Sequence, residues 1–194
     1  WLADLLAAEP EGSVDILALG PLTNLALLVR DHPAAAKRLG RVIAMGGAID
    51  ESGNMGPKAE FNMWVDPEAA AAVIAAGLAL TLIPLDVTRR VRATRATTAM
   101  LGASETACAR ASGALIDAYF QSTTGGASRP LHDPCVMLFA IRPELFGVEE
   151  MVLSVDLVDE PGALLTTRGS PVRVAMRVES DAALTLLCDR LMVR

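Results

Sequence analysis

Residues 53–62 read GNMGPKAEFN, and the rest of the chain can be interpreted outward from this stretch. Pro57 and the glycines Gly53 and Gly56 hold it out of regular structure. The apolar run RVIAMGG at 41–47 precedes it, and WVDPEAA at 64–70, which reads as a helix start, follows it. A strand, a polar loop and a helix in this order place the loop at the carboxyl end of a strand, where open α/β sheets bind ligands.

The loop carries two amides and a carboxylate, namely Asn54, Asn62 and Glu60. These side chains suit a ligand with several hydroxyl groups, such as a sugar, because each can accept hydrogen bonds. A solvated loop is the other interpretation. The apolar Met55 and Phe61 weaken it, since a purely solvated loop gains little from them.

The composition is that of a globular protein. The chain has 194 residues, enough for a single domain over residues 1–194, of which 52% are apolar and 21% charged. A net charge of −6 without a basic tract argues against a nucleic-acid partner and against an anionic membrane surface. No apolar run reaches the roughly 18 residues that span a bilayer. The odd number of distant cysteines and the lack of a recognisable signal peptide predict reduced, buried, cytosolic thiols at Cys108, Cys135 and Cys188.

Periodicity predicts alternating strands and helices in the first half of the chain. Strands are expected at 14–19, 41–45 and 80–84, and helices at 2–9, 25–30 and 67–76, the last capped by Asp66. This order indicates a parallel sheet with crossover helices. Further on we expect helices at 97–122 with a break near 102–104, at 135–141 and at 181–191, a loop at 123–130, and antiparallel strands at 150–158 and 172–178.

Two further polar pairs stand at helix starts. Thr23 with Asn24, and His132 with Asp133 before Pro134, can each be read as a helix cap. Asp133 can equally be a metal ligand held at a helix N-terminus, and His132 a catalytic residue. The sequence lacks paired cysteines or histidines for zinc, so its oxygen ligands would favour calcium or magnesium if a metal is bound.

Taken together, five ordered motifs resemble one family. They are LALGPLTNLALLV at 17–29, RVIAMGGAI at 41–49, GNMGPKAEFNMWVDPEAA at 53–70, LIPLDVT at 82–88 and PLHDPCVMLFAIRPELF at 130–146. The chain resembles the inosine-uridine-preferring nucleoside hydrolases, which are calcium-dependent N-ribohydrolases. The resemblance implies an α/β fold with a mixed, mainly parallel sheet flanked by helices. It also implies that water cleaves the N-glycosidic bond of a ribonucleoside to give ribose and a free base.

The resemblance implies a role for each residue of the central loop. Asn54, Glu60 and Asn62 match residues that hold the ribose hydroxyls, and Met45 and Phe61 match positions that pack near the sugar. Cleaving a glycosidic bond builds positive charge on the sugar, as in an oxocarbenium ion. A carboxylate and amide oxygens around the ribose can stabilise that charge.

The resemblance also implies a Ca²⁺ site and a proton donor. The Thr23 backbone carbonyl and the Asp133 carboxylate match calcium ligands, and His132 matches a residue beside the leaving base. Calcium prefers many oxygen ligands and can activate water. A histidine titrates near neutral pH, so it can protonate a poor leaving group.

Family members carry an opening D-x-D-x-x-x-D-D cluster ahead of the region where this chain starts. The chain begins at Trp1 within what reads as a helix, so we expect a fragment that lacks the first strands and most calcium ligands. Thr23 and Asp133 are too few for tight calcium binding, and the isolated chain should have little or no activity. The full-length protein is expected to be a cytoplasmic homodimer or homotetramer that serves purine or pyrimidine salvage.

Two other functions remain open from the sequence. One is a non-catalytic relative that binds nucleosides or sugars or serves assembly. The other is an enzyme of another class on a related α/β scaffold, such as a sugar-phosphate enzyme. A phosphate substrate would favour a cluster of basic residues near the loop, and Lys58 is the one basic residue there, which counts against this function. Base preference would depend on Tyr119 and residues 123–129, which the sequence does not place.

Overall fold

The computed structural model describes residues 1–122 and 126–193, so part of the predicted 123–130 loop lies outside the described residues. The chain divides into two compact units. We call Trp1–Val87 with Gly147–Arg177 the sheet unit, and Thr88–Phe146 with Val178–Arg194 the helical unit.

The sheet has the strand order β1-β2-β3-β7-β6. Strands β1 (Ile16–Ala18), β2 (Val42–Met45) and β3 (Leu80–Ile83) run parallel, with Ile43 paired to both Leu17 and Thr81. Strand β7 (Leu164–Val178) continues the sheet parallel to β3, and β6 (Phe146–Val155) is its neighbour. The predicted mixed, mainly parallel sheet with crossover helices is confirmed.

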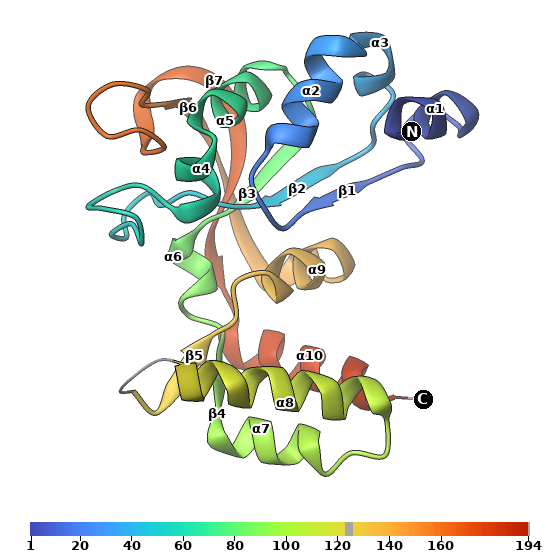
Figure 1. Cartoon of the computed structure of the whole chain (residues 1–194), viewed down its shortest axis with the longest axis vertical. Helices are drawn as coiled ribbons and strands as arrows, with labels where there is room; N and C mark the ends of the chain where they lie inside the picture. The colour runs from blue at the N-terminus through green and yellow to red at the C-terminus, as the bar shows by residue number, and fades with distance from the viewer. Residues whose placement is uncertain (123–125, 194) are drawn as a thin grey trace. The chain divides into compact units, whose positions relative to one another are not determined.

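Helices α1 (Leu2–Ala8), α2 (Thr23–Asp31) and α5 (Pro67–Ala75) pack against this sheet, and the short α3 (Pro33–Ala36) follows α2. Figure 1 shows α2 and α5 on the same side of the sheet. Successive side chains of a strand point to opposite faces of the sheet, so every second residue of a strand faces the helices on a given side. The shared core includes Leu6, Leu25, Leu28, Val42, Ala44, Val73, Leu80, Leu82 and Val174.

Helices α4 (Phe61–Val65) and α6 (Leu85–Thr88) were not predicted from the sequence. Helix α4 begins inside the predicted loop because the Glu60 side chain caps it. The predicted cap of α5 is confirmed, since the Asp66 carboxylate accepts a hydrogen bond from Ala69 N–H at 3.1 Å. Strand β6 ends at Val155 rather than at residue 158, because the Asp156 carboxylate instead holds a turn by accepting the Val158 N–H.

In the helical unit, α7 (Arg95–Gly102) and α8 (Ala107–Ser122) flank the predicted break. They share a small core with α10 (Ser180–Met192), made by Leu101, Ala109 and Cys188. Strands β4 (Arg92–Thr94) and β5 (Ser128–Pro130) form an antiparallel ribbon that the sequence analysis missed. Helix α9 (Pro134–Ile141) is followed by the turn η1 (Pro143–Leu145).

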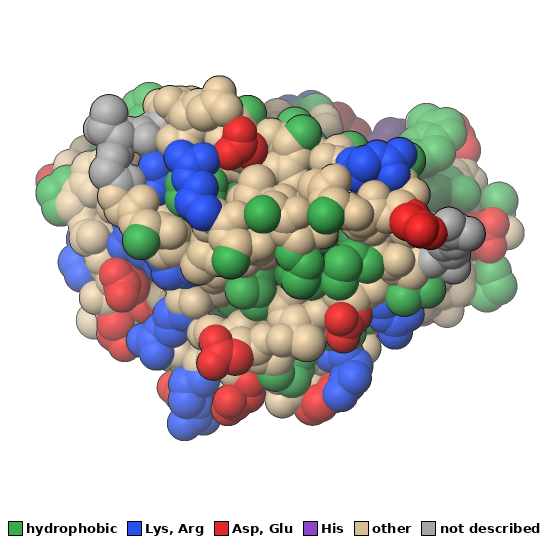
Figure 2. All heavy atoms as spheres, turned by 90° about the horizontal axis from the view of Figure 1, so that it is seen from below, with side chains coloured by type: hydrophobic (Ala, Val, Ile, Leu, Met, Phe, Trp, Pro, Cys, Tyr) green, Lys and Arg blue, Asp and Glu red, His purple; other side chains and the backbone are tan. Residues whose placement is uncertain are grey.

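Figure 2 looks at the molecule from the α7 side and shows apolar side chains in the middle of this face, with acidic and basic side chains around them. None of the helices in the described part of the chain has both the length and the apolar character needed to span a membrane.

All three cysteines are free thiols. Cys135 and Cys188 are buried as predicted, but Cys108 is exposed, so the expectation of burial was wrong there.

Candidate functional site

The double glycine after β2 lets the chain turn where a side chain would not fit. Gly47 has a φ of +86°, and a Cβ on it would lie 2.4 Å from Leu164 Cδ1. A Cβ on Gly46 would lie 2.6 Å from Met63 Cε and 3.3 Å from Glu60 Oε2. The two glycines therefore make room for the Glu60 carboxylate beside the end of β2.

Glu60 is only 2% exposed, although it carries an acidic side chain. Its Oε2 accepts backbone N–H hydrogen bonds from Asn62 at 2.9 Å, from Gly47 at 3.2 Å and from Met63 at 3.3 Å. Burying a carboxylate is unfavourable unless it is hydrogen-bonded, and these donors from both sides of the loop supply the bonds. Glu60 is thus fixed between the end of β2 and the start of α4.

The other predicted sugar-binding residues join Glu60. Asn62 is 6% exposed, and its Nδ2 donates to the Met45 carbonyl at 3.1 Å and to the Met45 sulfur at 3.4 Å. Asn54 is exposed, and its Oδ1 accepts the Phe61 N–H at 2.8 Å. We call Met45, Asn54, Glu60, Phe61 and Asn62 the Glu60 cluster. The structure brings all five together, and the burial of Glu60 and Asn62 rules out a purely solvated loop.

The Glu60 cluster has hydrogen-bonding capacity left over. Among the described residues, no donor bonds the Asn62 Oδ1 and no acceptor bonds the Asn54 Nδ2. An amide oxygen and an amide nitrogen that lack protein partners can bond the hydroxyl groups of a ligand.

Two further segments, not expected from the sequence, hold the loop and the residues just before it. The buried Asp86 carboxylate accepts N–H bonds from Ile49 at 2.9 Å, from Asp50 at 2.8 Å and from Glu51 at 3.1 Å. The turn between β6 and β7 also bonds the loop, because Glu160 accepts the Lys58 N–H.

Close backbone packing adds to this second support. Ala59 forms an antiparallel bridge with Ala163. Gly162 lies so close to α4 that a Cβ on it would be 2.6 Å from Trp64 Cα. These contacts join positions about 100 residues apart, and the only local signal for them was the glycine at 162.

In the helical unit, His132 lies beside Thr88. His132 Nδ1 is 2.8 Å from the Thr88 hydroxyl oxygen. Burial lowers the pKa of His132, and the nearby Arg89 and Arg92 guanidinium groups lower it further. The structure therefore favours the neutral imidazole.

Asp133 immediately precedes α9, but its side chain makes no capping hydrogen bond. The helix-cap interpretation of this side chain is therefore not supported. Burial raises the pKa of Asp133 above its ordinary value. Burial also raises the pKa of the Cys135 thiol to about 12, with a smaller contribution from Asp133.

The residues suggested for calcium do not make a complete site. Thr23 is the first residue of α2, and its hydroxyl donates a hydrogen bond to the Asp66 carboxylate. Over residues 1–122 and 126–193, no group of three or more His, Cys, Asp or Glu side chains could hold a metal. Calcium takes 6–8 oxygen ligands, so Thr23 and Asp133 alone do not fit it.

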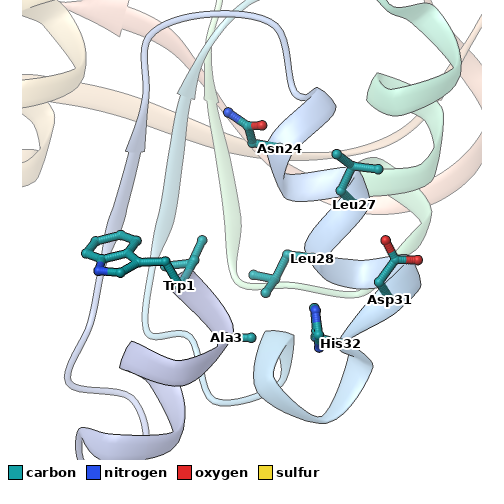
Figure 3. Close-up of a pocket in the computed structure, with 8 residues that line it drawn as sticks. Trp1, Ala3, Asn24, Leu27, Leu28, Asp31 and His32 are labelled. Carbon is teal, nitrogen blue, oxygen red and sulfur yellow. The ribbon is translucent and has the colours of Figure 1, made fainter.

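A pocket of about 390 Å³ lies between α1 and α2 in the sheet unit. Figure 3 shows Trp1 at the start of α1, and Leu28 with Asp31 on α2, with His32 just after the end of α2. None of the residues predicted to form the functional site lines this pocket. Its lining is mostly apolar, unlike the Glu60 cluster.

The fold and the Glu60 cluster define an α/β protein with polar side chains suited to hydroxyl groups at the carboxyl end of a parallel strand. The sequence profile of the family "Inosine-uridine preferring nucleoside hydrolase" matches residues 1–185. The chain therefore belongs to the inosine-uridine preferring nucleoside hydrolases.

Three relatives show how far the similarity extends. The pyrimidine-specific ribonucleoside hydrolase RihA of Salmonella newport (strain SL254) is 36% identical over 159 residues, which is 80% of this chain and 50% of the relative. A plant nucleoside hydrolase, PpNRh1, has a structure with a TM-score of 0.92 and 30% identity, covering 100% of this chain and 66% of that one. An inosine-guanosine nucleoside hydrolase has a TM-score of 0.86 and 25% identity, covering 97% and 65%. The chain spans about half the length of the curated relatives it matches.

Proposed function

We propose that the protein containing this chain hydrolyses the N-glycosidic bond of ribonucleosides to ribose and a free base. The observation that carries the proposal is the buried Glu60 carboxylate at the end of β2, held by three backbone N–H groups beside Asn62 and Met45. Membership of the nucleoside hydrolase family supports it.

In this proposal the Glu60 cluster binds the sugar. Asn54, Glu60 and Asn62 hold ribose hydroxyls, and Met45 and Phe61 pack near the ring. The transition state carries positive charge on the sugar, as an oxocarbenium-like ion, and the fixed negative charge of Glu60 stabilises it. Because backbone donors already hold Glu60 in place, little reorganisation accompanies the reaction.

We assign His132 to the leaving base. Departure of a base leaves negative charge on its ring, and a hydrogen-bond or proton donor beside it lowers the barrier. A histidine with a lowered pKa is a stronger acid in its protonated form, although that form is less populated at neutral pH. Its neutral form still has one N–H donor.

Calcium is part of the proposal for the whole protein, with the Thr23 backbone carbonyl and the Asp133 carboxylate among its ligands. A bound divalent cation would orient ribose hydroxyls and polarise the attacking water. The isolated chain should hold calcium poorly and have little activity, because the described residues offer too few ligands. We also propose a cytoplasmic location and a homodimer or homotetramer, as the family resemblance suggests.

The relatives leave base preference open. One is named as specific for pyrimidine nucleosides and another for inosine and guanosine. The test is therefore a panel of uridine, cytidine, inosine, guanosine and adenosine, incubated with the full-length natural protein in phosphate-free buffer containing Ca²⁺.

Equal amounts of ribose and free base are expected from at least one nucleoside, and a metal chelator should stop their release. A requirement for phosphate, with ribose 1-phosphate as product, would contradict hydrolysis. Binding of nucleosides without cleavage would instead support a non-catalytic binding module.

A further inference from the structure

The ribbon of β4 and β5 brings Thr88 and His132 together, although they lie 44 positions apart in the sequence. Arg92 pairs with Pro130 in the ribbon, and Leu131 N–H extends the pairing to the Val91 carbonyl at 2.8 Å. Beyond this end of the ribbon, His132 follows Leu131 directly, and Thr88 lies three positions before Val91 at the end of α6. Their side chains meet at 2.8 Å, from Thr88 Oγ1 to His132 Nδ1.

The direction of this hydrogen bond follows from the burial of Thr88, whose exposed fraction is 0%. Among the described residues, the Thr88 hydroxyl has no hydrogen-bond partner other than His132. If His132 Nδ1 were the donor, the Thr88 hydroxyl hydrogen would be buried without an acceptor, which is unfavourable. The Thr88 hydroxyl therefore donates, and Nδ1 accepts.

A neutral imidazole that accepts at Nδ1 carries its hydrogen on Nε2, because one ring nitrogen is the donor and the other the acceptor. We infer that Thr88 is a positioning residue that fixes the tautomer and ring orientation of His132, so that Nε2–H is the group offered to the leaving base. This inference rests on the proposed function for the role of His132. The hydrogen bond itself rests on the geometry alone.

The first test needs no substitution and no activity. The full-length natural protein, labelled with ¹⁵N in its histidines, is examined by NMR under conditions where the imidazole is neutral. The His132 signals are assigned by their loss in His132→Gln. The inference predicts an unprotonated Nδ1 and a protonated Nε2. A hydrogen on Nδ1, or a mixture of both tautomers, overturns it.

The second test compares two substitutions at Thr88. Thr88→Val keeps the shape but removes the hydroxyl, while Thr88→Ser keeps the hydroxyl. We expect Thr88→Val to lower kcat about 10-fold or more with little change in KM, because the hydrogen bond at one ring nitrogen sets which nitrogen of a catalytic histidine carries the proton. Thr88→Ser should restore most of kcat and the wild-type tautomer.

Thr81→Val is the matched control, because Thr81 is also a buried threonine and lies in β3. It should leave kcat and the His132 signals unchanged. A folded Thr88→Val protein with wild-type kcat would overturn the positioning role. If Thr88→Val does not fold, Thr88→Ser and the wild-type spectrum still decide.

The two proposals can fail separately. If the natural protein cleaves no nucleoside, the proposed function fails, and the tautomer spectrum alone then supports or overturns the Thr88–His132 pairing. If nucleosides are cleaved but the tautomer is the opposite one, the proposed function stands and the inference fails.

Discussion

The Glu60 cluster and His132 are held in place in different ways. Glu60 is fixed by backbone N–H groups from the start of α4 and from Gly47 after β2, at most 13 positions away. His132 is fixed by one side-chain hydroxyl that lies 44 positions away. Backbone donors depend on chain geometry, whereas the His132 contact depends on a side-chain hydroxyl at position 88. The comparison predicts which substitutions act through backbone conformation and which act through one side chain.

The largest effect is expected at Glu60. Glu60→Gln keeps the length and an acceptor oxygen but removes the negative charge. We expect kcat/KM of the full-length protein for its best nucleoside to fall about 100- to 1,000-fold, as when a group that stabilises transition-state charge is lost. The control is Glu68→Gln, at an exposed acid in the first turn of α5. Equal activity of Glu60→Gln and wild type would contradict a role for that charge.

A second prediction concerns the backbone that fixes Glu60. Gly47→Ala puts a Cβ at positive φ and against Leu164, so we expect the free energy of unfolding to fall by about 3 kcal/mol. Gly20→Ala is the control, because a Cβ there meets nothing within 4 Å. Chemical denaturation measures both. Similar stabilities of the two variants would show that the Gly47 conformation is not needed.

The substitution Asp86→Asn tests whether the Asp86 carboxylate stabilises residues 49–51, the segment after β2. The buried carboxylate accepts three backbone N–H bonds, and an amide cannot accept all of them equally well. We expect a loss of about 2 kcal/mol in the free energy of unfolding. Asp156→Asn is the comparison, since Asp156 also accepts three N–H bonds but near the surface, and it should lose less. A larger loss at Asp156 would reverse this interpretation.

The last prediction concerns the cysteines, and no effect on activity or stability is expected from it. Cys108 is exposed, whereas Cys135 is buried with its thiol pKa raised to about 12. The native protein at pH 8 should therefore be alkylated at Cys108 more than about 100-fold faster than at Cys135. Peptide mass mapping after timed alkylation measures the two rates. Equal rates would mean that the region around α9 opens readily.

Much of the sheet unit could be predicted from the sequence because its signals are local. Short apolar runs followed by helices indicated β1, β2 and β3, and Asp66 with Pro67 marked the start of α5. The start of α4 was missed because its cap is a glutamate, which is outside the usual capping residues. Local patterns therefore predicted the position of the loop but not the residue at which it ends and α4 begins.

The hydrogen-bond partners of the predicted loop and of His132 could not be predicted from local sequence patterns. Glu160 bonds the Lys58 backbone across 102 positions, and Thr88 bonds His132 across 44. Nothing in the periodicity of either segment specifies these pairings, because they follow from how strands and turns pack. Thr88 stood inside a motif quoted for the family resemblance, yet no role could be given to it before the structure placed it beside His132.

Nucleosides that lack one hydroxyl test most directly whether the Glu60 cluster recognises the ribose hydroxyls. We would measure kcat/KM for a cleaved ribonucleoside and for its 2′-, 3′- and 5′-deoxy forms, in the wild type and in Glu60→Gln. The wild type should reject at least one deoxy form about 100-fold or more, and this discrimination should largely disappear in Glu60→Gln. Equal discrimination in both proteins would contradict the assignment of Glu60 to the sugar.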